Sequence, residues 1–479
     1  MYRLFSEYFK TKISGKEGWF DPIIGQDVRL FMDPFLVDKN GRYFPEFRKS
    51  HIEVISFFNN VFQDTAKLVM RSGKTIEPLL RSLTFPEVQE LYLGYSKPGN
   101  RGAGSSKGYA KLLLSATFEL IDSGITSISR FEELELFKEG FGADRIGDMM
   151  ANLLKPSLVI YTNRICKKLG IKLSRYRLKH MYHSKGRVWQ DSRVYLPCIK
   201  NEFGENNFVI LVPKCFLRHL PTIDIKNFWD YCYSHENDVI RNQFGNDIKK
   251  NVDRETMFRA ARKSAKLRTS YLKSLRNKIA EPYNIEKDPE LFHKWLHIGK
   301  VVSKENPLRF NLVSNNRDFI KIVDQIIGRF KHFIEEKKGW RVLRDDSTDK
   351  GKKEEVVQRL FDGITSAYCE ANNIDYSPEE NSGSGPVDFK FSNGFERRTL
   401  IEVKLARNSR LFYGARKQLP TYLKSHKIKH GFYIIIIYEA EDFEKINVIR
   451  KELPKIEKKL SLKIELITVD AQKQKSASK

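Results

Sequence analysis

The chain has 479 residues, of which 41% are hydrophobic and 30% are charged, and its formal net charge is +25 at pH 7. This length predicts roughly two to four domains, and the hydrophobic share excludes a wholly disordered protein. No apolar run approaches the length of about eighteen residues that a membrane-spanning helix needs, and the first residues lack the apolar core of a signal peptide. We therefore expect a cytoplasmic protein without a membrane partner.

The first segment, residues 1–284, is predicted to be a mixed α/β region that serves a substrate, a partner or regulation. Residues 351–479 hold 24 Lys or Arg and 18 Asp or Glu, which leaves +19 of the total charge of +25 for residues 1–350. Residues 161–190 contain nine cations and no acidic residue, with aromatic side chains between them, a composition typical of nucleic-acid binding. Within this segment we expect Arg175 and Arg177 to contact nucleic acid.

A second basic segment covers residues 241–280, and acidic residues are absent from its second half. Its cations recur at steps of three, four and seven residues, so on one continuous helix they would line one face and follow the phosphates of a nucleic acid. The alternative is an ordinary solvated helix face. The residues predicted to bind nucleic acid here are Arg259, Arg262, Lys266, Lys273 and Arg276.

Residues 285–344 are predicted to be a helical connector, because apolar residues recur at helical spacing between Phe319 and Phe333. The segment 345–353 contains no apolar residue and has the composition of a linker or an exposed loop. It opens the predicted third domain, residues 345–479.

The third domain alternates helix and strand patterns, which predicts an α/β class, or α+β for the whole chain with its helix-rich N-terminal region. Asn393-Gly394 is a strong hairpin signal. The run 431–438 is continuously apolar, as in a strand that is buried on both faces. The expected elements are a helix at 354–371, strands at 373–376, 387–391 and 399–405, a helix at 409–425, a strand at 431–438, a helix at 442–460 and a strand at 462–469.

The hairpin brings two carboxylates and one ammonium together, Asp388 on one strand and Glu402 and Lys404 on the next. Residues two apart on a strand point to the same face, so Glu402 and Lys404 share one side. Hard divalent cations prefer oxygen ligands, so Asp388, Glu402 and the carbonyl of Val403 are candidate ligands of Mg²⁺ or Mn²⁺. Lys404 would then orient an attacking water or stabilise the charge that develops on a phosphate.

These elements and this motif resemble the PD-(D/E)xK, or restriction-endonuclease-like, nuclease superfamily over roughly residues 352–469. The resemblance implies an αβββαβ core, an extra acidic metal ligand on the first helix, and a Gln and a Tyr four residues apart on the second helix. The family's Pro is replaced by Val387, and Pro420 lies inside the second helix pattern, where it would kink the helix. The corresponding residues here are Glu355, with Glu354 as its competitor, for the acidic ligand, and Gln418 with Tyr422 for the pair.

The resemblance implies a Mg²⁺- or Mn²⁺-dependent endonuclease that acts on DNA, and prokaryotic antiviral defence is one expected setting. Because many such domains work in pairs to cut both strands, we also expect a homo-oligomer. Three alternatives remain open: cleavage of RNA, a role in DNA repair, and a non-catalytic protein that binds nucleic acid or supports an assembly through a nuclease-like scaffold.

Overall fold

A computed structural model of the protein describes residues 3–12, 17–69, 76–94, 105–125, 127–128, 133, 136–137, 143–200, 204–219, 223, 225–244, 252–277, 281–308, 310, 315–345, 347–372, 374–381, 386–393 and 397–474. The chain forms two compact units, Met1–Glu286 and Lys287–Lys479. Helices and strands are mixed in both units, so the fold is of the α/β or α+β class. None of the described helices is both long enough and apolar enough to cross a membrane.

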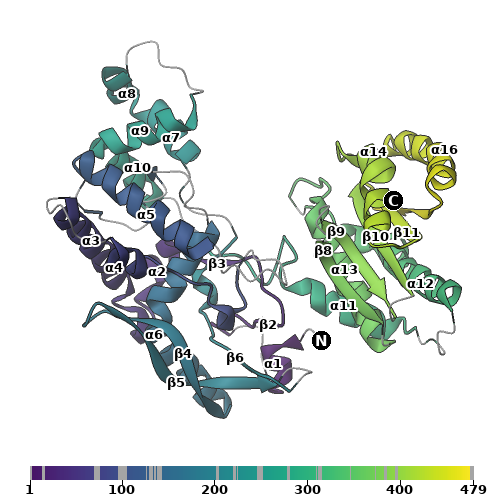
Figure 1. Ribbon diagram of the computed structural model, residues 1–479, viewed down its shortest axis with the longest axis horizontal. Coiled ribbons are helices and arrows are strands. Elements are labelled where there is room, and N and C mark those ends of the chain that lie inside the picture. The colour runs from purple at the N-terminus through teal and green to yellow at the C-terminus, as the bar shows by residue number, and fades with distance from the viewer. Residues whose placement is uncertain are drawn as a thin grey trace. The chain divides into compact units, whose positions relative to one another are not determined.

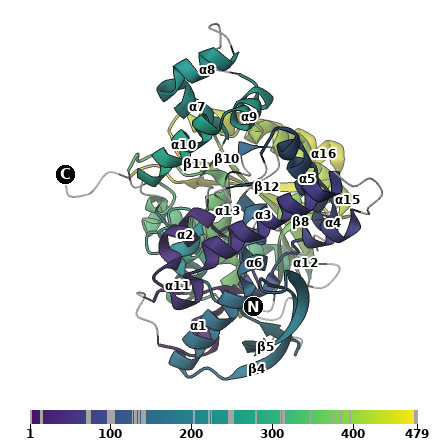
Figure 2. The same ribbon diagram turned by 90° about the vertical axis from the view of Figure 1, so that its left-hand side faces the viewer.

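The N-terminal unit is built mainly from helices, with one long hairpin (Figures 1 and 2). Local capping explains where some of the helices begin. Asp33, for example, accepts a hydrogen bond from the amide of Phe35, and Pro34 occupies the first turn of α2. The described elements of this unit are β1 (Arg3–Leu4), α1 (Phe5–Tyr8), β2 (Ile23–Ile24), β3 (Phe31–Met32), α2 (Pro34–Gly41), α3 (Ser50–Val69), α4 (Glu77–Ser82), α5 (Ser105–Asp122), α6 (Ala143–Leu169), β4 (Leu173–His183), β5 (Val188–Lys200), β6 (Asn206–Phe208), β7 (Leu217–Arg218), α7 (Ile225–His235), α8 (Asn237–Phe244), α9 (Arg254–Lys263) and α10 (Ala265–Asn277).

Helix α6 supports the three-stranded antiparallel sheet β4-β5-β6. Leu178, Val194 and Leu196 are buried, while the adjacent residues Arg177, Arg193 and Tyr195 are exposed, so this part of the sheet has one apolar and one polar face. One buried cation ties the helix to the sheet. The Nζ of Lys155 donates hydrogen bonds to Oδ1 of Asn152 at 3.0 Å and to the carbonyls of Lys179 and His180, each at 3.1 Å.

Replacing Lys155 with methionine is expected to lower the free energy of unfolding of the N-terminal unit by about 2–4 kcal/mol. The methionine fills a similar volume but leaves two partly buried strand carbonyls without this donor. The matched control is Lys167→Met, at an exposed position near the end of the same helix, which should change stability by less than about 0.5 kcal/mol. Urea unfolding followed by hydrogen exchange of α6 and β4 measures both effects. Equal stability of the two variants would contradict a role for this contact.

The same lysine makes stability depend on pH. Burial lowers the pKa of Lys155 from 10.5 to about 8, and the charges of Glu90 and Asp148 oppose this shift only in part. Between these two values the unfolded chain binds more protons than the folded chain, so folding is favoured as the pH rises from about 8 to 10. Wild type should therefore gain about 2 kcal/mol relative to Lys155→Met over that window, and parallel pH profiles of the two proteins would count against it.

Helices α7 to α10 pack around a separate apolar cluster that includes Phe228, Trp229 and Tyr271. The predicted continuous basic helix over this region is not observed, because Ser264 has an extended backbone conformation and separates α9 from α10. The cations therefore do not form one regular stripe. Their surroundings also differ: the guanidinium of Arg262 donates to the carbonyl of Phe137 and to Glu255, and Lys266 lies 3.9 Å from Glu236. Arg259 and Lys273 are exposed, and the side chain of Arg276 lies outside the described residues.

The C-terminal unit holds a five-stranded mixed sheet in the order β12-β11-β10-β9-β8 (Figure 1). The pairs β12/β11 and β11/β10 are parallel, and the remaining two pairs are antiparallel. The described helices and strands of this unit are α11 (Lys294–Glu305), α12 (Asn316–Glu336), α13 (Glu354–Ala371), β8 (Asp375–Asn381), β9 (Pro386–Ser392), β10 (Arg398–Leu405), α14 (Leu411–Tyr413), α15 (Leu419–Ser425), β11 (His430–Ile437), α16 (Asp442–Leu460) and β12 (Lys463–Asp470). Those of the predicted third domain follow the expected order, and most bounds are close to the predicted ones. Two differ: the strand predicted at 373–376 is observed at Asp375–Asn381, and the helix predicted at 409–425 is divided into α14, a π-helical turn and α15.

Helices cover both faces of this sheet. On one face, Phe361 of α13 lies between Phe330 of α12 and Phe389 of β9, with ring centroids 5.0 and 4.9 Å apart. On the other face, α15 and α16 pack on a cluster that contains Leu400 and Tyr433. Strand β11 is buried along its whole length, as the apolar run predicts. The result is a sheet between two helical layers, in which any polar side chain on a central strand is withdrawn from water.

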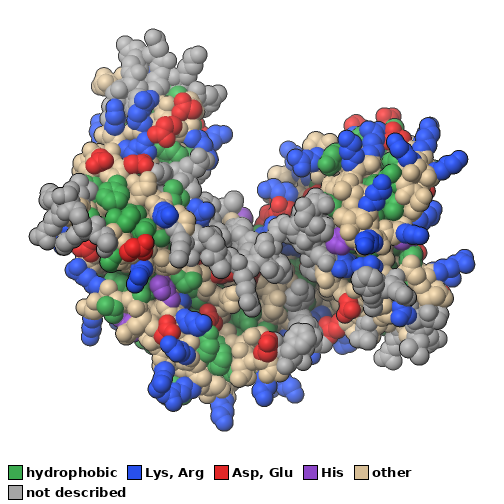
Figure 3. Space-filling view, viewed as in Figure 1, with side chains coloured by type: hydrophobic (Ala, Val, Ile, Leu, Met, Phe, Trp, Pro, Cys, Tyr) green, Lys and Arg blue, Asp and Glu red, His purple; other side chains and the backbone are tan. Residues whose placement is uncertain are grey.

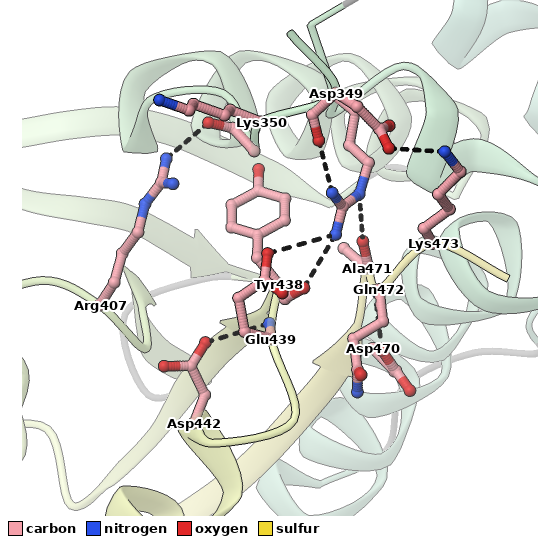
Figure 4. A network of polar contacts seen from close by, with 12 residues as sticks. Asp349, Lys350, Arg407, Tyr438, Glu439, Asp442, Asp470, Ala471, Gln472 and Lys473 are labelled. Atoms are coloured by element: carbon pink, nitrogen blue, oxygen red, sulfur yellow. Dashed lines mark hydrogen bonds and ion pairs between the residues drawn. The ribbon is translucent and has the colours of Figure 1, made fainter.

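The predicted separation of a helical connector and a linker is not observed. Residues 287–344 belong to the same compact unit as the sheet, since α11 and α12 both pack against α13. The described part of the segment that reads as a linker, Asp345 and residues 347–353, includes a turn that is held by polar contacts (Figure 4). Arg344 donates hydrogen bonds to the carbonyls of Asp349, Tyr438 and Ala471, and Lys473 pairs with Asp349 at 2.7 Å. The segment is polar because polar contacts hold this turn in place. Composition alone does not distinguish such a turn from a flexible linker.

Helices α11 and α13 approach each other at two glycines. A Cβ on Gly299 would stand 1.8 Å from the carbonyl oxygen of Gly363, and a Cβ on Gly363 would stand 2.2 Å from the carbonyl oxygen of Trp295. Both distances are far inside van der Waals contact. The crossing therefore requires glycine at both positions and fixes how α13 lies on the sheet.

Candidate active site

The carboxylate of Asp388 stands where strands β9 and β10 stop pairing. Their register ends at the pair Phe389 and Ile401, two residues before Val403. The amide of Val403 donates to Oδ2 of Asp388, at 2.7 Å. This contact turns the carboxylate toward β10 and explains why the hairpin brings the predicted residues together.

Lys404 lies at the centre of three carboxylates. Its Nζ is 2.9 Å from Oε1 of Glu402, 3.1 Å from Oε1 of Glu354 and 3.8 Å from Oδ2 of Asp388. Glu402 and Lys404 are both buried, since Glu402 has no exposed surface and Lys404 is 7% exposed. Three negative groups thus surround one positive group inside the sheet layer, at a place where ordinary packing would favour apolar side chains.

Glu354, not Glu355, supplies the acidic side chain of the first helix. It is the first residue of α13, where the helix dipole favours a negative charge, and its Oε2 accepts from the amide of Leu405 at 3.0 Å and from Nδ2 of Asn408 at 2.7 Å. The structure does not bring Glu355 into the cluster. Its side chain is 62% exposed and lies 3.6 Å from Arg359, one turn along the same helix. Adjacent helix positions differ in direction by about 100°, so only one of the two carboxylates can face the sheet.

Gln418 and Tyr422 do lie at the site. The Nε2 of Gln418 donates to Oε1 of Glu402 at 2.6 Å, and the Gln418 side chain also hydrogen-bonds Tyr422, which is 5% exposed. Pro420 explains the local shape. Helix α15 starts at Leu419 with this proline in its first turn, directly after a π-helical turn at Gly414–Gln418. The expected kink is thus a change of helix type that carries Gln418 toward Glu402.

Burial and mutual charge control the protonation of the cluster. Burial raises the pKa of Glu402 and of Asp388, the negative charge of the neighbouring carboxylates raises each pKa further, and the positive charge of Lys404 opposes both shifts. For Lys404, burial lowers the pKa, but the charges of Asp388, Glu402 and Glu354 outweigh it, so that its pKa is raised above the ordinary value. Lys404 is therefore a permanent cation, and an additional positive charge at the site would stabilise the ionised carboxylates further.

The oxygen donors fit a hard divalent cation. Oε2 of Glu402 is fully buried and has no hydrogen-bond partner among the described residues, which leaves a desolvated carboxylate oxygen for another ligand. Asp388 and the carbonyl of Val403 add two more oxygens of the type that Mg²⁺ and Mn²⁺ prefer. Within the described part of the chain, no group of three or more His, Cys, Asp or Glu side chains is already arranged to hold a metal. The three carboxylates converge on the Lys404 ammonium instead.

Two neighbours of the cluster were not predicted. Gln358 hydrogen-bonds Asp388, and Asn408 contacts Glu354. Gln358 lies one turn after Glu354 on α13, so the two share one helix face. The four-residue spacing of Glu354 and Gln358 is visible in the sequence. It would have favoured Glu354 over Glu355 as the residue that faces Asp388. Asn408 follows the end of β10 in a loop, and no local pattern marks it.

Two family models match parts of the chain. Residues 10–224 are similar to a domain of unknown function, DUF8370, and residues 319–440 are similar to a second domain of unknown function, DUF8371. No curated protein and no solved structure matches the chain. The second matched segment begins within α12 and ends shortly after β11, and it contains Glu354, Asp388, Glu402 and Lys404, which we call the Lys404 cluster.

Proposed function

We propose that the C-terminal unit is a metal-dependent nuclease of the PD-(D/E)xK type that hydrolyses phosphodiester bonds, with DNA as its substrate. The observation that carries the proposal is the buried Lys404 ammonium among Glu354, Asp388 and Glu402, with one Glu402 oxygen left without a partner. A purely structural role explains this poorly, because buried charge costs more than apolar packing of the same volume. Desolvated groups with shifted pKa values are typical of active sites.

Each residue has a role that follows from its contacts. Asp388, Glu402 and the carbonyl of Val403 would hold Mg²⁺ or Mn²⁺, which supplies charge stabilisation at the phosphate and a more acidic bound water. Gln418 orients Glu402 by donating to Oε1 and leaves Oε2 available. Lys404 presents N–H donors to the negative charge that develops on the phosphoryl oxygens.

Supporting contacts hold these groups in place. Gln358 and the amide of Val403 fix the carboxylate of Asp388, and Glu354 fixes the ammonium of Lys404 from its other side. Such partners typically contribute ten- to a hundredfold in metal affinity or activity. The strongly positive net charge of the chain favours a nucleic acid as the phosphodiester substrate.

The proposal is tested by incubating the full-length protein with supercoiled plasmid, linear duplex, single-stranded DNA and RNA in Mg²⁺, Mn²⁺ or EDTA. We expect cleavage of DNA in either metal and none in EDTA. Lys404→Met, which keeps the length of the side chain and removes its charge, should lower the rate by at least about a hundredfold. Lys424→Met, at an exposed position on α15, serves as the control and should cleave like wild type.

Four results separate the alternatives. Cleavage of RNA but not DNA would change the substrate and keep the reaction. Tight binding of nucleic acid without cleavage in any metal would favour the scaffold function, and so would the absence of Mn²⁺ binding in calorimetry. Full activity of a correctly folded Lys404→Met protein would show that Lys404 has no part in cleavage and would contradict the proposed site.

A further inference from the structure

The outer face of the hairpin β4–β5 in the N-terminal unit is unusually basic. Residues 173–193 contain six cations and one acidic residue, Asp191. The opposite face of the hairpin is apolar and packs on α6, so the charged residues are confined to the exposed side. Figure 3 shows Lys and Arg side chains gathered along the part of the N-terminal unit where Figure 1 draws this hairpin. The six cations are Arg175, Arg177, Lys179, Lys185, Arg187 and Arg193, and all six are exposed.

The strand register places like charges directly opposite each other. Arg177 of β4 pairs with Arg193 of β5, and Arg175 pairs with Tyr195. Like charges at directly opposed positions destabilise a sheet, so this arrangement costs stability in the free protein. Asp191 offsets only part of this repulsion, through a 3.0 Å contact with Arg177. Arg175 and Arg193 have no acidic partner in the described part of the chain. An anion that lies across both strands would remove the repulsion.

An aromatic side chain accompanies the cations. Tyr195 is 58% exposed on the same face, although tyrosine usually buries its ring. Basic side chains that follow a backbone, with an aromatic ring on which a base or sugar packs, are the combination by which proteins hold nucleic acids without reading sequence. At the tip, Lys185 and Arg187 extend the same charge beyond the paired strands.

The length of the surface fits such a ligand. An eleven-residue strand such as β4 extends for about 35 Å, which is close to one turn of a DNA duplex. Since its apolar face is covered by α6, the hairpin cannot insert into a groove as a free ribbon. A duplex is therefore contacted through its sugar-phosphate backbone, as expected for binding without sequence specificity.

We propose that the outer face of β4–β5 is a nucleic-acid-binding surface that holds the sugar-phosphate backbone through Arg175, Arg177 and Arg193, with Tyr195 packed against the strand. It would retain the substrate independently of the catalytic unit. This inference rests on the proposed function only in taking nucleic acid as the polyanion. It adds Arg193 and Tyr195, which the sequence did not single out, to the two predicted arginines.

The test measures binding of a fluorescent 30-base-pair duplex by the full-length protein in EDTA, where a metal-dependent enzyme does not cut. The variant Arg175→Gln/Arg193→Gln removes two exposed charges that make no ion pair. We expect at least about tenfold weaker binding at 150 mM salt, and a slope of log affinity against log salt that is smaller by about two. The control Lys458→Gln/Lys459→Gln, at exposed positions on α16, removes the same charge and should change the affinity by less than about threefold.

Two further measurements identify the class of ligand and the role of Tyr195. Tyr195→Ser should weaken binding of a single-stranded 30-mer more than binding of the duplex, because only unpaired bases are free to stack. Unchanged affinity and salt slope in the arginine double variant would overturn the proposal. Equally tight binding of wild type to phosphatidylserine vesicles, lost in the same variant, would overturn nucleic acid as the ligand. Because binding is read without cleavage, a protein that binds through the hairpin but never cuts would contradict only the proposed nuclease.

Discussion

Replacing Glu354 with glutamine is expected to lower the cleavage rate by about ten- to a hundredfold, whereas Glu355→Gln should leave it unchanged. The glutamine keeps an oxygen that can accept from the amide of Leu405, but it loses the charge that faces Lys404 at 3.1 Å. Lys404 would then be balanced by two carboxylates instead of three and would be drawn more strongly toward Glu402 and Asp388. Initial rates of plasmid nicking in Mg²⁺, with both variants at equal concentration, measure the effect.

The matched variant makes this result specific. Glu355 has the same side chain one position later on α13, but it is exposed and contacts Arg359. A general effect of acidic charge near the start of this helix would lower both rates equally. Loss of activity in Glu355→Gln together with full activity in Glu354→Gln would contradict the assignment of Glu354 to the site.

Replacing Gly299 with alanine is expected to destabilise the C-terminal unit by about 3–5 kcal/mol, among the largest effects that a single substitution produces. The added Cβ would stand 1.8 Å from the carbonyl oxygen of Gly363, and backbone atoms cannot move aside as the end of a flexible side chain can. Helix α11 must therefore shift away from α13. We expect earlier urea unfolding and faster hydrogen exchange in α11.

Gly328→Ala is the control for this prediction. Gly328 lies within α12, and apart from its chain neighbours and its own helix backbone a Cβ there would meet no atom within 4 Å. Because alanine has the higher helix propensity, this substitution should stabilise the unit by up to about 1 kcal/mol. If Gly299→Ala behaves like Gly328→Ala, the close crossing of α11 and α13 does not exist in solution.

The sequence predicted the sheet region well because its signals are local. The helix at 354–371 and the helix at 442–460 have the bounds that periodicity indicates, and the strands around Asp388 and Glu402 differ from the predicted ones by a residue or so at each end. In this region, apolar runs and turn residues lie next to the elements that they define. Strand register also follows from the alternation of side chains, which places Glu402 and Lys404 on one face.

The remaining features depend on contacts between distant segments. The choice between Glu354 and Glu355 is decided by how α13 docks on the sheet, and that docking depends on Gly299, more than fifty residues earlier in the chain. The predicted linker proved to be a turn because Arg344 donates to the carbonyl of Ala471, just after β12, and to the carbonyl of Tyr438, just after β11. Such partners cannot be predicted from the residues that are adjacent in sequence.

The basic segments illustrate the same limit. Residues at steps of three, four and seven lie on one face only if they belong to one continuous helix. Ser264 interrupts the helix between α9 and α10. In the hairpin, by contrast, pairing between strands brings Arg193 beside Arg177. The spacing of these residues along the chain does not predict this proximity.

Hydrolysis of phosphodiester bonds by the Lys404 cluster is tested most directly by comparing wild type with Asp388→Asn on supercoiled plasmid in Mg²⁺. Asparagine preserves the volume of the side chain and an oxygen that can accept from the amide of Val403, so the fold should be retained. We expect metal-dependent cleavage by wild type and a loss of at least about a thousandfold in the variant, at unchanged duplex affinity in EDTA. Cleavage by a folded Asp388→Asn protein at the wild-type rate would contradict the proposed nuclease.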